Sequence, residues 1–156
     1  MGISETKKIS VLGIGYIGLP ILLKLSQNTS FEILGFDLDI KRVNELNSGV
    51  DRNKEQDLTE ILDTGKLRFS CKEEDIDSSN IYIVTVPTPI DESSKPNLNA
   101  LKSAASLISK SINRTTDKNL DSNENSFLIV IESTVFPGAT NDIFAEKLLS
   151  EIKPEI

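Results

Sequence analysis

The sequence predicts an α/β fold with a doubly wound, mainly parallel sheet and helices on both of its faces. Three observations lead to this prediction. Short apolar runs alternate with helical patterns along most of the chain, which is typical of βαβ units. The run 81–86 is almost continuously apolar, as expected of a central parallel strand that is covered on both faces. A glycine-rich turn joins the first apolar run to the first helical pattern.

The first half of the chain contains three expected strands and three expected helices. Strands are expected at 9–12, 31–36 and 67–70, and helical spacing of apolar residues begins near 16, 40 and 58. Pro20 falls in the first turn of the first helix, where its missing N–H is tolerated. Asp39 is expected to cap the second helix, and Gly49 and Gly65 to follow the ends of the second and third.

The second half repeats the alternation after the central strand. Apolar residues at helical spacing span 97–111, and 127–131 fits a further strand. Residues 113–126 are rich in Asn, Asp, Ser and Thr and have no apolar period, so we expect an exposed loop there. A final amphipathic helix is expected to stop near Pro154. Because no repeat or linker divides the chain, residues 1–156 are expected to form one domain.

The composition argues against several classes of function. The chain has 156 residues, 24 acidic and 17 basic side chains, and a formal net charge of −7. This balance argues against a nucleic-acid partner, which requires clustered Lys and Arg. With no histidine and one cysteine, Cys71, neither a metal site nor a histidine-dependent triad is expected. No apolar run approaches the ~20 residues of a membrane span, so we expect a cytoplasmic protein that binds a small molecule.

Gly13, Gly15 and Gly18 form a G-x-G-x-x-G pattern between an expected strand and an expected helix. In a Rossmann-like domain the first glycine permits the tight turn and the second lets a pyrophosphate approach the backbone. The third lets the helix and the strand pack closely. The N-terminus of the helix would meet the negative charge of the pyrophosphate. The alternative is a glycine-rich turn that binds no ligand.

Asp37 favours the ligand-binding interpretation, because it ends the second expected strand about 20 residues after Gly18. A carboxylate at this position accepts hydrogen bonds from the adenosine ribose and repels a 2′-phosphate, so the expected cofactor is NAD rather than NADP. Arg42 is close enough in sequence to contact the ribose or a phosphate. We expect it to stack or hydrogen-bond near the adenosine, with a solvated helix charge as the alternative.

Two further loops follow strands that should neighbour the first one, at the carboxyl edge where open α/β sheets bind ligands. One is 86–89, with Thr88, and the other begins at Glu132 and contains Ser133-Thr134. Each places a hydroxyl where the nicotinamide half of a dinucleotide would extend. The alternatives are a rigid strand exit in the first loop and a helix cap in the second. Glu132 is a candidate for a general acid or base, although no partner for it is visible in the sequence.

Together these segments resemble the N-terminal NAD-binding domain of nucleotide-sugar dehydrogenases of the UDP-glucose/GDP-mannose type. The matching motifs are G-I-G-Y-I-G-L-P at 13–20, G-F-D at 35–37, V-P-T-P at 86–89 and E-S-T-V-F-P-G at 132–138. The segments at 49–52 and 86–91 are most similar to the bacterial UDP-N-acetyl-hexosamine branch. UDP-N-acetylglucosamine 6-dehydrogenase is the first choice there and the mannosamine enzyme the second. Residues 53–56 depart from that branch, which leaves the exact sugar open.

The resemblance implies which residues contact NAD and which residue assists the reaction. The implied cofactor contacts are Gly13, Gly15, Tyr16, Ile17, Gly18, Asp37, Arg42, Thr88 and Thr134. Thr134 also matches a threonine that the family's mechanism places beside the reacting centre, where it assists by orienting a water. No metal is implied.

The family reaction oxidises the C6 alcohol of a UDP-sugar to a carboxylate for polysaccharide precursor synthesis, with reduction of two NAD molecules. It uses a cysteine nucleophile in a middle helical segment and a UDP-sugar site in a C-terminal domain. The chain stops at Ile156, before those parts, and Cys71 does not match the place of the nucleophile. We therefore expect the chain alone to bind NAD without catalysis, and the full-length enzyme to be a homodimer.

Two other hypotheses compete with this one. The chain could be a free-standing NAD-binding or redox-sensing module. It could also be the cofactor domain of a dehydrogenase of the 6-phosphogluconate or hydroxyacyl-CoA type, which the loop at 132–138 disfavours.

Overall fold

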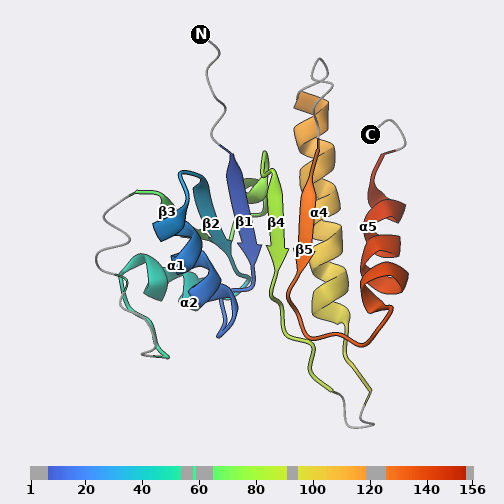
Figure 1. The fold of residues 1–156 in the computed structure, drawn as a ribbon, viewed down its shortest axis with the longest axis horizontal. Coiled ribbons are helices and arrows are strands. Elements are labelled where there is room, and N and C mark those ends of the chain that lie inside the picture. The colour runs from blue at the N-terminus through green and yellow to red at the C-terminus, as the bar shows by residue number, and fades with distance from the viewer. Residues whose placement is uncertain (1–6, 54–57, 59–64, 91–94, 119–125, 154–156) are drawn as a thin grey trace.

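The computed structural model describes residues 7–53, 58, 65–90, 95–118 and 126–153 (Figure 1). Five strands form one sheet in the order β3-β2-β1-β4-β5, and each neighbouring pair is parallel. The strands are β1 (Lys8–Leu12), β2 (Glu32–Phe36), β3 (Leu67–Ser70), β4 (Ile81–Val84) and β5 (Leu128–Ile131). The expected α/β fold is therefore confirmed.

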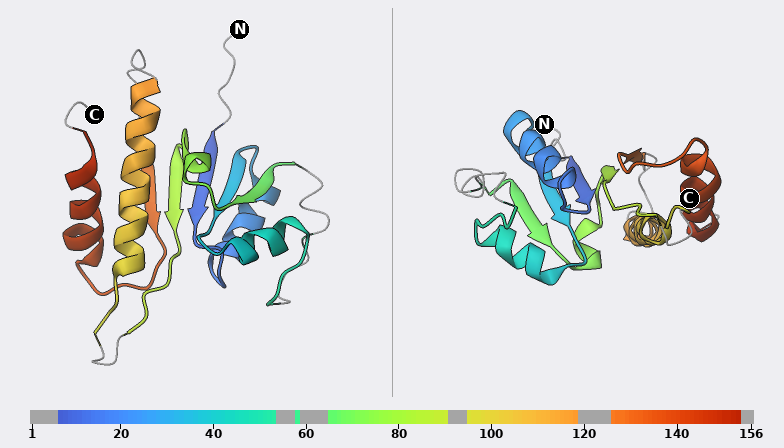
Figure 2. Two further views of the ribbon diagram at one scale, coloured as in Figure 1. Left: turned by 180° about the vertical axis from the view of Figure 1, so that it is seen from behind. Right: turned by 90° about the horizontal axis from the view of Figure 1, so that it is seen from below.

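Helices connect the strands and lie on both sides of the sheet. They are α1 (Gly18–Asn28), α2 (Ile40–Asn47), α4 (Asn99–Lys118) and α5 (Glu146–Glu151), together with a 3-10 turn, η1 (Glu73–Ile76), and a π-helical turn, η2 (Thr140–Ala145). Figure 1 and the left view of Figure 2, seen from behind, place α1 on one side of the sheet and α4 on the other. Asp39 caps α2 as expected, because its carboxylate accepts the N–H groups of Lys41 and Arg42.

The core consists of two apolar clusters, one on each face of the sheet. Ile9 and Val11 of β1 belong to the cluster that contains the buried side chains of α1 and α2. Tyr82 and Val84 of β4 belong to the cluster that contains those of α4 and α5. Since successive side chains of a strand point to opposite faces of the sheet, each of these strands contributes apolar side chains to both clusters.

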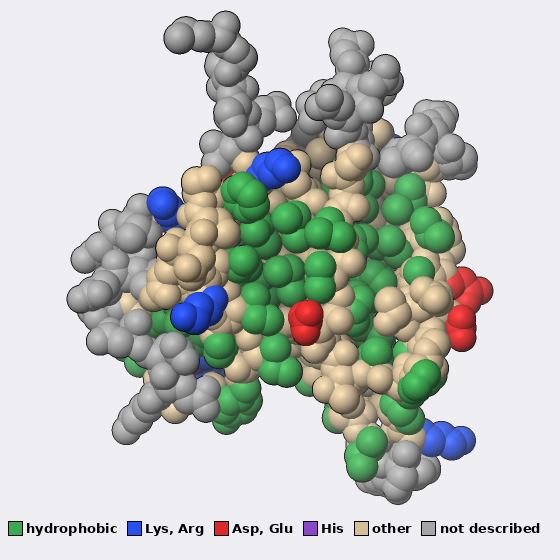
Figure 3. Space-filling model, viewed as in Figure 1, with side chains coloured by type: hydrophobic (Ala, Val, Ile, Leu, Met, Phe, Trp, Pro, Cys, Tyr) green, Lys and Arg blue, Asp and Glu red, His purple; other side chains and the backbone are tan. Residues whose placement is uncertain are grey.

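The face of the sheet that carries α1 is only partly covered over β4 and β5. Ile81, Ile83 and Val130 are half-buried, and the side chain of Leu128 is 55% exposed. Figure 3 shows apolar side chains gathered in the middle of this face of the molecule. The strands β1 and β2 are thus better shielded from solvent than β5 at the edge.

The structure corrects the expected loop at 113–126, because residues 113–118 are the last turns of α4. Asn113 donates from Nδ2 to the carbonyl of Glu151 at 2.9 Å, and Arg114 pairs with Asp77 at 2.8 Å. The hydroxyl of buried Thr115 accepts the N–H of Ser78. These contacts with distant residues extend the helix through a polar segment of weak helix propensity. Residues 119–125, and most of the helix expected after Leu58, lie outside the described residues.

The cluster between α1 and the sheet gives a direct test of this packing. Leu22 of α1 is fully buried, whereas Leu149 of α5 is 66% exposed. Replacing Leu22 by Ala should lower the free energy of unfolding by about 2–5 kcal/mol, because the change leaves a cavity in the core. The control Leu149→Ala should stay within about 0.5 kcal/mol of the parent in urea denaturation. Equal losses in the two variants would contradict the described core.

Candidate functional site

The carboxyl ends of four strands meet at one edge of the sheet. β1 pairs with β2 on one side and with β4 on the other, so the winding of the chain reverses between β1 and β4. Ligands of open α/β sheets bind at such a reversal. The segments that reach this edge are the glycine turn 13–18, Asp37, the loop 85–89 and the loop 132–136. The fold therefore brings together the segments singled out from the sequence.

The glycine turn joins β1 to α1 in very little space. Gly13 has a φ of 98° and donates its N–H to the carbonyl of Phe36 at 2.8 Å. A Cβ on Gly18 would lie only 1.9 Å from the carbonyl oxygen of Gly13, so the helix is seated directly on the turn. A Cβ on Gly15 would meet no atom within 4 Å. The space beside Gly15 is thus open to a ligand that approaches the backbone.

The N-terminus of α1 is uncapped in the part of the chain that the structure describes. No side chain among those residues caps it, and its first turn contains no acidic residue. The neighbouring Tyr16 and Ile17 are 69% and 48% exposed. Because a helix N-terminus presents partial positive charge and N–H donors, this end of α1 suits a phosphate group. The open space at Gly15 and the uncapped helix therefore fit the pyrophosphate of a dinucleotide.

Asp37 lies beside the glycine turn and is half-buried. Its Oδ2 accepts the N–H of Ile14 at 2.8 Å and its Oδ1 accepts the N–H of Asp39 at 2.9 Å. Each carboxylate oxygen has a second lone pair that can accept a ribose hydroxyl. The next carboxylate, Asp39, is committed to α2, and the hydrogen bond from the N–H of Arg42 lowers the pKa of Asp39. Asp37 is thus the carboxylate at the turn that can still accept further hydrogen bonds.

Arg42 is buried beneath the glycine turn. Its Nε donates to the carbonyl of Ile14 at 3.1 Å, and its Nη1 forms an ion pair with Asp51 at 2.8 Å. Its Nη2 is enclosed and has no hydrogen-bond partner among the described residues. Arg42 is therefore not the solvated helix charge considered as the alternative. A direct contact of Arg42 with the adenosine stays a prediction.

The loops after β4 and β5 are tied together by two hydroxyl groups. Thr88 donates from Oγ1 to the carbonyl of Thr134 at 2.5 Å, and Ser133 donates from Oγ to the carbonyl of Val86 at 2.7 Å. Ser133 does not cap a helix, since the next helical segment begins only at Thr140. The structure therefore brings Thr88 and Thr134, which are distant in sequence, into contact.

Glu132 and Cys71 contribute less to this arrangement. Glu132 is exposed directly after β5. Cys71 is a free cysteine that follows β3, the strand at the far edge of the sheet, and β2 separates it from the glycine turn. Cys71 therefore lies away from the glycine turn.

Sequence reasoning missed Thr85, which fixes the glycine turn from the neighbouring strand. Its side chain is buried, and Oγ1 lies 2.7 Å from the carbonyl oxygen of Gly13 and 3.1 Å from that of Leu12. No local signal in the sequence could have identified this residue, because the contact exists only once β4 lies beside β1.

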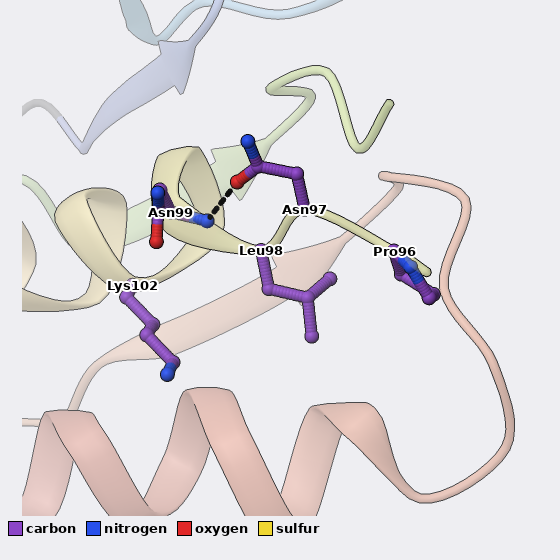
Figure 4. Close-up of a pocket in the computed structure, with 5 residues that line it drawn as sticks. All are labelled: Pro96, Asn97, Leu98, Asn99 and Lys102. Carbon is purple, nitrogen blue, oxygen red and sulfur yellow. Dashed lines mark hydrogen bonds between the residues drawn. The ribbon is translucent and has the colours of Figure 1, made fainter. Parts of the chain in front are cut away.

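An open hollow of about 350 Å³ lies elsewhere, at the N-terminal end of α4 (Figure 4). It is lined by Pro96, Asn97, Leu98, Asn99 and Lys102. The Asn97 side chain forms a hydrogen bond within the protein there, because its Oδ1 accepts the N–H of Asn99 at 3.0 Å. A second hollow lies between α4 and α5. Neither hollow includes the glycine turn or Asp37. We nevertheless place the candidate site at the sheet edge, because the hydrogen bonds and the open space described above lie there.

The part of the chain that the structure describes contains neither a metal site nor a membrane-spanning helix. No group of three or more His, Cys, Asp or Glu side chains could hold a metal ion there. Within the same residues, no helix is both long enough and apolar enough to cross a bilayer.

Comparisons with known proteins find relatives that match most of the chain. Residues 7–155 match the NAD-binding domain of the UDP-glucose/GDP-mannose dehydrogenase family. The chain is 35% identical over 135 residues to a UDP-N-acetyl-D-glucosamine 6-dehydrogenase of Pseudomonas aeruginosa, covering 86% of the chain and 29% of that protein. It is 37% identical over 141 residues to the Salmonella typhi enzyme of the same name, covering 90% and 30%. The chain thus spans about 30% of the length of these curated relatives.

A solved structure of a related protein has a similar fold. The UDP-D-ManNAc dehydrogenase of Pyrococcus horikoshii superposes with a TM-score of 0.78 at 32% sequence identity. The superposition covers 92% of this chain and 32% of that protein.

The glycine turn gives a matched pair of substitutions. Gly18→Ala should lower the free energy of unfolding by more than about 2 kcal/mol, because the new methyl group collides with the carbonyl of Gly13. Gly15→Ala should unfold within about 1 kcal/mol of the parent, since its methyl group enters open space. Urea denaturation of both variants measures the difference. A Gly18→Ala variant as stable as the parent would show that α1 is not seated on the turn.

Proposed function

The chain belongs to the UDP-glucose/GDP-mannose dehydrogenase family, and we propose that it is the cofactor-binding part of a UDP-N-acetyl-hexosamine 6-dehydrogenase. NAD is the cofactor of this family's domain. One observation carries the assignment to this chain's residues. The open space at Gly15, the uncapped N-terminus of α1 and the carboxylate of Asp37 lie together at the carboxyl end of β1, next to the reversal point of the sheet.

Each part of the site has a role toward NAD in this proposal. Gly13 and Gly18 shape the turn, and the backbone at Gly15, Tyr16 and Ile17 receives the pyrophosphate. Asp37 accepts hydrogen bonds from the hydroxyl groups of the adenosine ribose. When bound, NAD would accept a hydride from the alcohol carbon of the substrate.

The nicotinamide end of NAD would reach the loops after β4 and β5. The hydrogen bond from Thr88 to the carbonyl of Thr134 supports this role, because it holds both residues at one place on the sheet edge. Thr134 would assist the reaction there by orienting a water molecule. Arg42 would act near the adenosine.

The substrate assignment rests on the relatives and not on a substrate site in this chain. The relatives from P. aeruginosa and S. typhi are named for UDP-N-acetyl-D-glucosamine and that from P. horikoshii for UDP-D-ManNAc. We propose a UDP-N-acetyl-hexosamine as the substrate class, with the sugar site and the nucleophile in protein segments beyond these 156 residues. Reaction would then require those segments together with this domain.

Location and assembly follow from the same proposal. We place the enzyme in the cytoplasm, where NAD is supplied and a free thiol such as Cys71 stays reduced. A homodimer of the full-length enzyme stays a prediction from the family resemblance.

Calorimetric titration of the chain with NAD tests the proposed cofactor site. The parent should bind NAD at concentrations up to millimolar. Gly15→Val should weaken binding at least about tenfold, because its side chain fills the space assigned to the pyrophosphate. The variant's unfolding midpoint serves as the control for its fold. Absence of heat with the parent, or identical titrations of the parent and the variant, would refute NAD binding at this turn.

The preference for NAD over NADP tests the role of Asp37. Asp37→Asn removes the negative charge but keeps an oxygen that can accept the N–H of Ile14. The parent should bind NAD at least about tenfold more tightly than NADP, and the variant should lose most of that difference, because like charge no longer repels the 2′-phosphate. Equal affinities of the parent for the two nucleotides, measured by the same titration, would contradict this role.

A further inference from the structure

Two charged side chains bind the backbone of one residue of the glycine turn, Ile14. Asp37 accepts the N–H of Ile14 at 2.8 Å, and the Nε of Arg42 donates to its carbonyl at 3.1 Å. The two side chains therefore hold both polar groups of the same residue. This grip fixes the orientation of the backbone that leads into Gly15, where the pyrophosphate is proposed to bind.

Asp51 holds Arg42 in this position from the far side. Its Oδ1 lies 2.8 Å from Nη1 of Arg42, and both side chains are enclosed, with 1% and 6% of their surface exposed. The same Oδ1 accepts the N–H of Asn53 at 3.2 Å, which anchors the carboxylate. Since the pair is buried, salt in the solvent screens it little. Arg42 is thus fixed by Ile14 and Asp51 together.

This arrangement also sets the charge next to the proposed ribose site. Asp37, Arg42 and Asp51 together carry one net negative charge, and the positive charge of Arg42 is directed toward Asp51. In NADP-binding sites an arginine near this position accommodates the 2′-phosphate. Arg42 has a spare donor for such a group, because its enclosed Nη2 has no partner among the described residues. Its Nε and Nη1 are held by the carbonyl of Ile14 and by Asp51.

We propose that Asp51 is a positioning residue that sets the preference for NAD over NADP by holding Arg42 under the glycine turn. The inference rests on the proposed NAD binding. Asp51 does not touch the nucleotide in this account, and it acts through Arg42. When the carboxylate is neutralised, Arg42 is released toward the ribose side of the site, where its charge favours a 2′-phosphate.

The chain offers a matched control for the loss of one negative charge. Glu45 lies on α2, as Arg42 does, and its carboxylate pairs with Arg52 at 2.5 Å. That pair is exposed, with 36% of the Glu45 side chain and 42% of the Arg52 side chain accessible. Glu45→Gln therefore changes the net charge by the same amount as Asp51→Asn without touching Arg42.

The test compares the dissociation constants of NAD and NADP for each variant of the chain by calorimetry. Asp51→Asn should shift the ratio of the two constants about fivefold toward NADP, as expected for one freed charge acting on a phosphate several ångströms away. Glu45→Gln should shift it less than about twofold. The double variant Arg42→Met/Asp51→Asn should shift the ratio clearly less than Asp51→Asn does, because the arginine that would serve the phosphate is gone.

Each alternative result has a defined meaning. Equal weakening of NAD and NADP by Asp51→Asn would make Asp51 merely structural and overturn the proposal. A double variant that shifts as far as Asp51→Asn would overturn it too, since Asp51 would then act by its own charge. If Asp51→Asn does not fold, Arg42→Lys replaces it, because one ammonium cannot hold Ile14 and Asp51 together as the guanidinium does. An unchanged ratio in that variant would overturn the proposal. A parent chain that binds neither nucleotide would instead refute the proposed function itself.

Discussion

The structure depends on the direct contact between the start of α1 and the end of β1. That contact requires a residue without a side chain at position 18, because a Cβ there would lie 1.9 Å from the carbonyl oxygen of Gly13 and 2.7 Å from the hydroxyl of Thr85. The contact points the positive end of α1 at the reversal between β1 and β4. It also leaves the space beside Gly15 unfilled. Fold and candidate site therefore share one steric constraint.

The local patterns of the sequence predict the sheet and most of its helices well. Apolar runs identify β1, β2, β4 and β5 to within two residues, because most side chains of these strands are apolar and pack against one of the two core clusters. The end of α4 could not be predicted in this way. Its last turns are polar, and they are helical because Asn113 reaches α5 and Arg114 reaches Asp77. Such contacts depend on the finished fold and leave no period in the sequence.

The same division applies to the candidate site. Gly13, Gly15, Gly18 and Asp37 could be singled out from the sequence, because glycines at this spacing between a strand and a helix, with a carboxylate at the end of the next strand, form a recognisable pattern. The network behind them is not predictable from one sequence. Arg42 has the appearance of a surface charge on α2, yet it is buried with Asp51 against the carbonyl of Ile14. Residues that hold a site in place are thus recognised only once the strands are assembled.

The central claim is that NAD binds along the carboxyl edge of β1 and β2. A titration of the ¹⁵N-labelled chain with NAD, followed by the backbone amide resonances, tests this claim residue by residue. The account predicts the largest shifts in the turn 13–18 and at Asp37, with smaller shifts in the loops after β4 and β5. Shifts confined to the hollows at α4, around Asn97 and Lys102, would place the nucleotide elsewhere and contradict it.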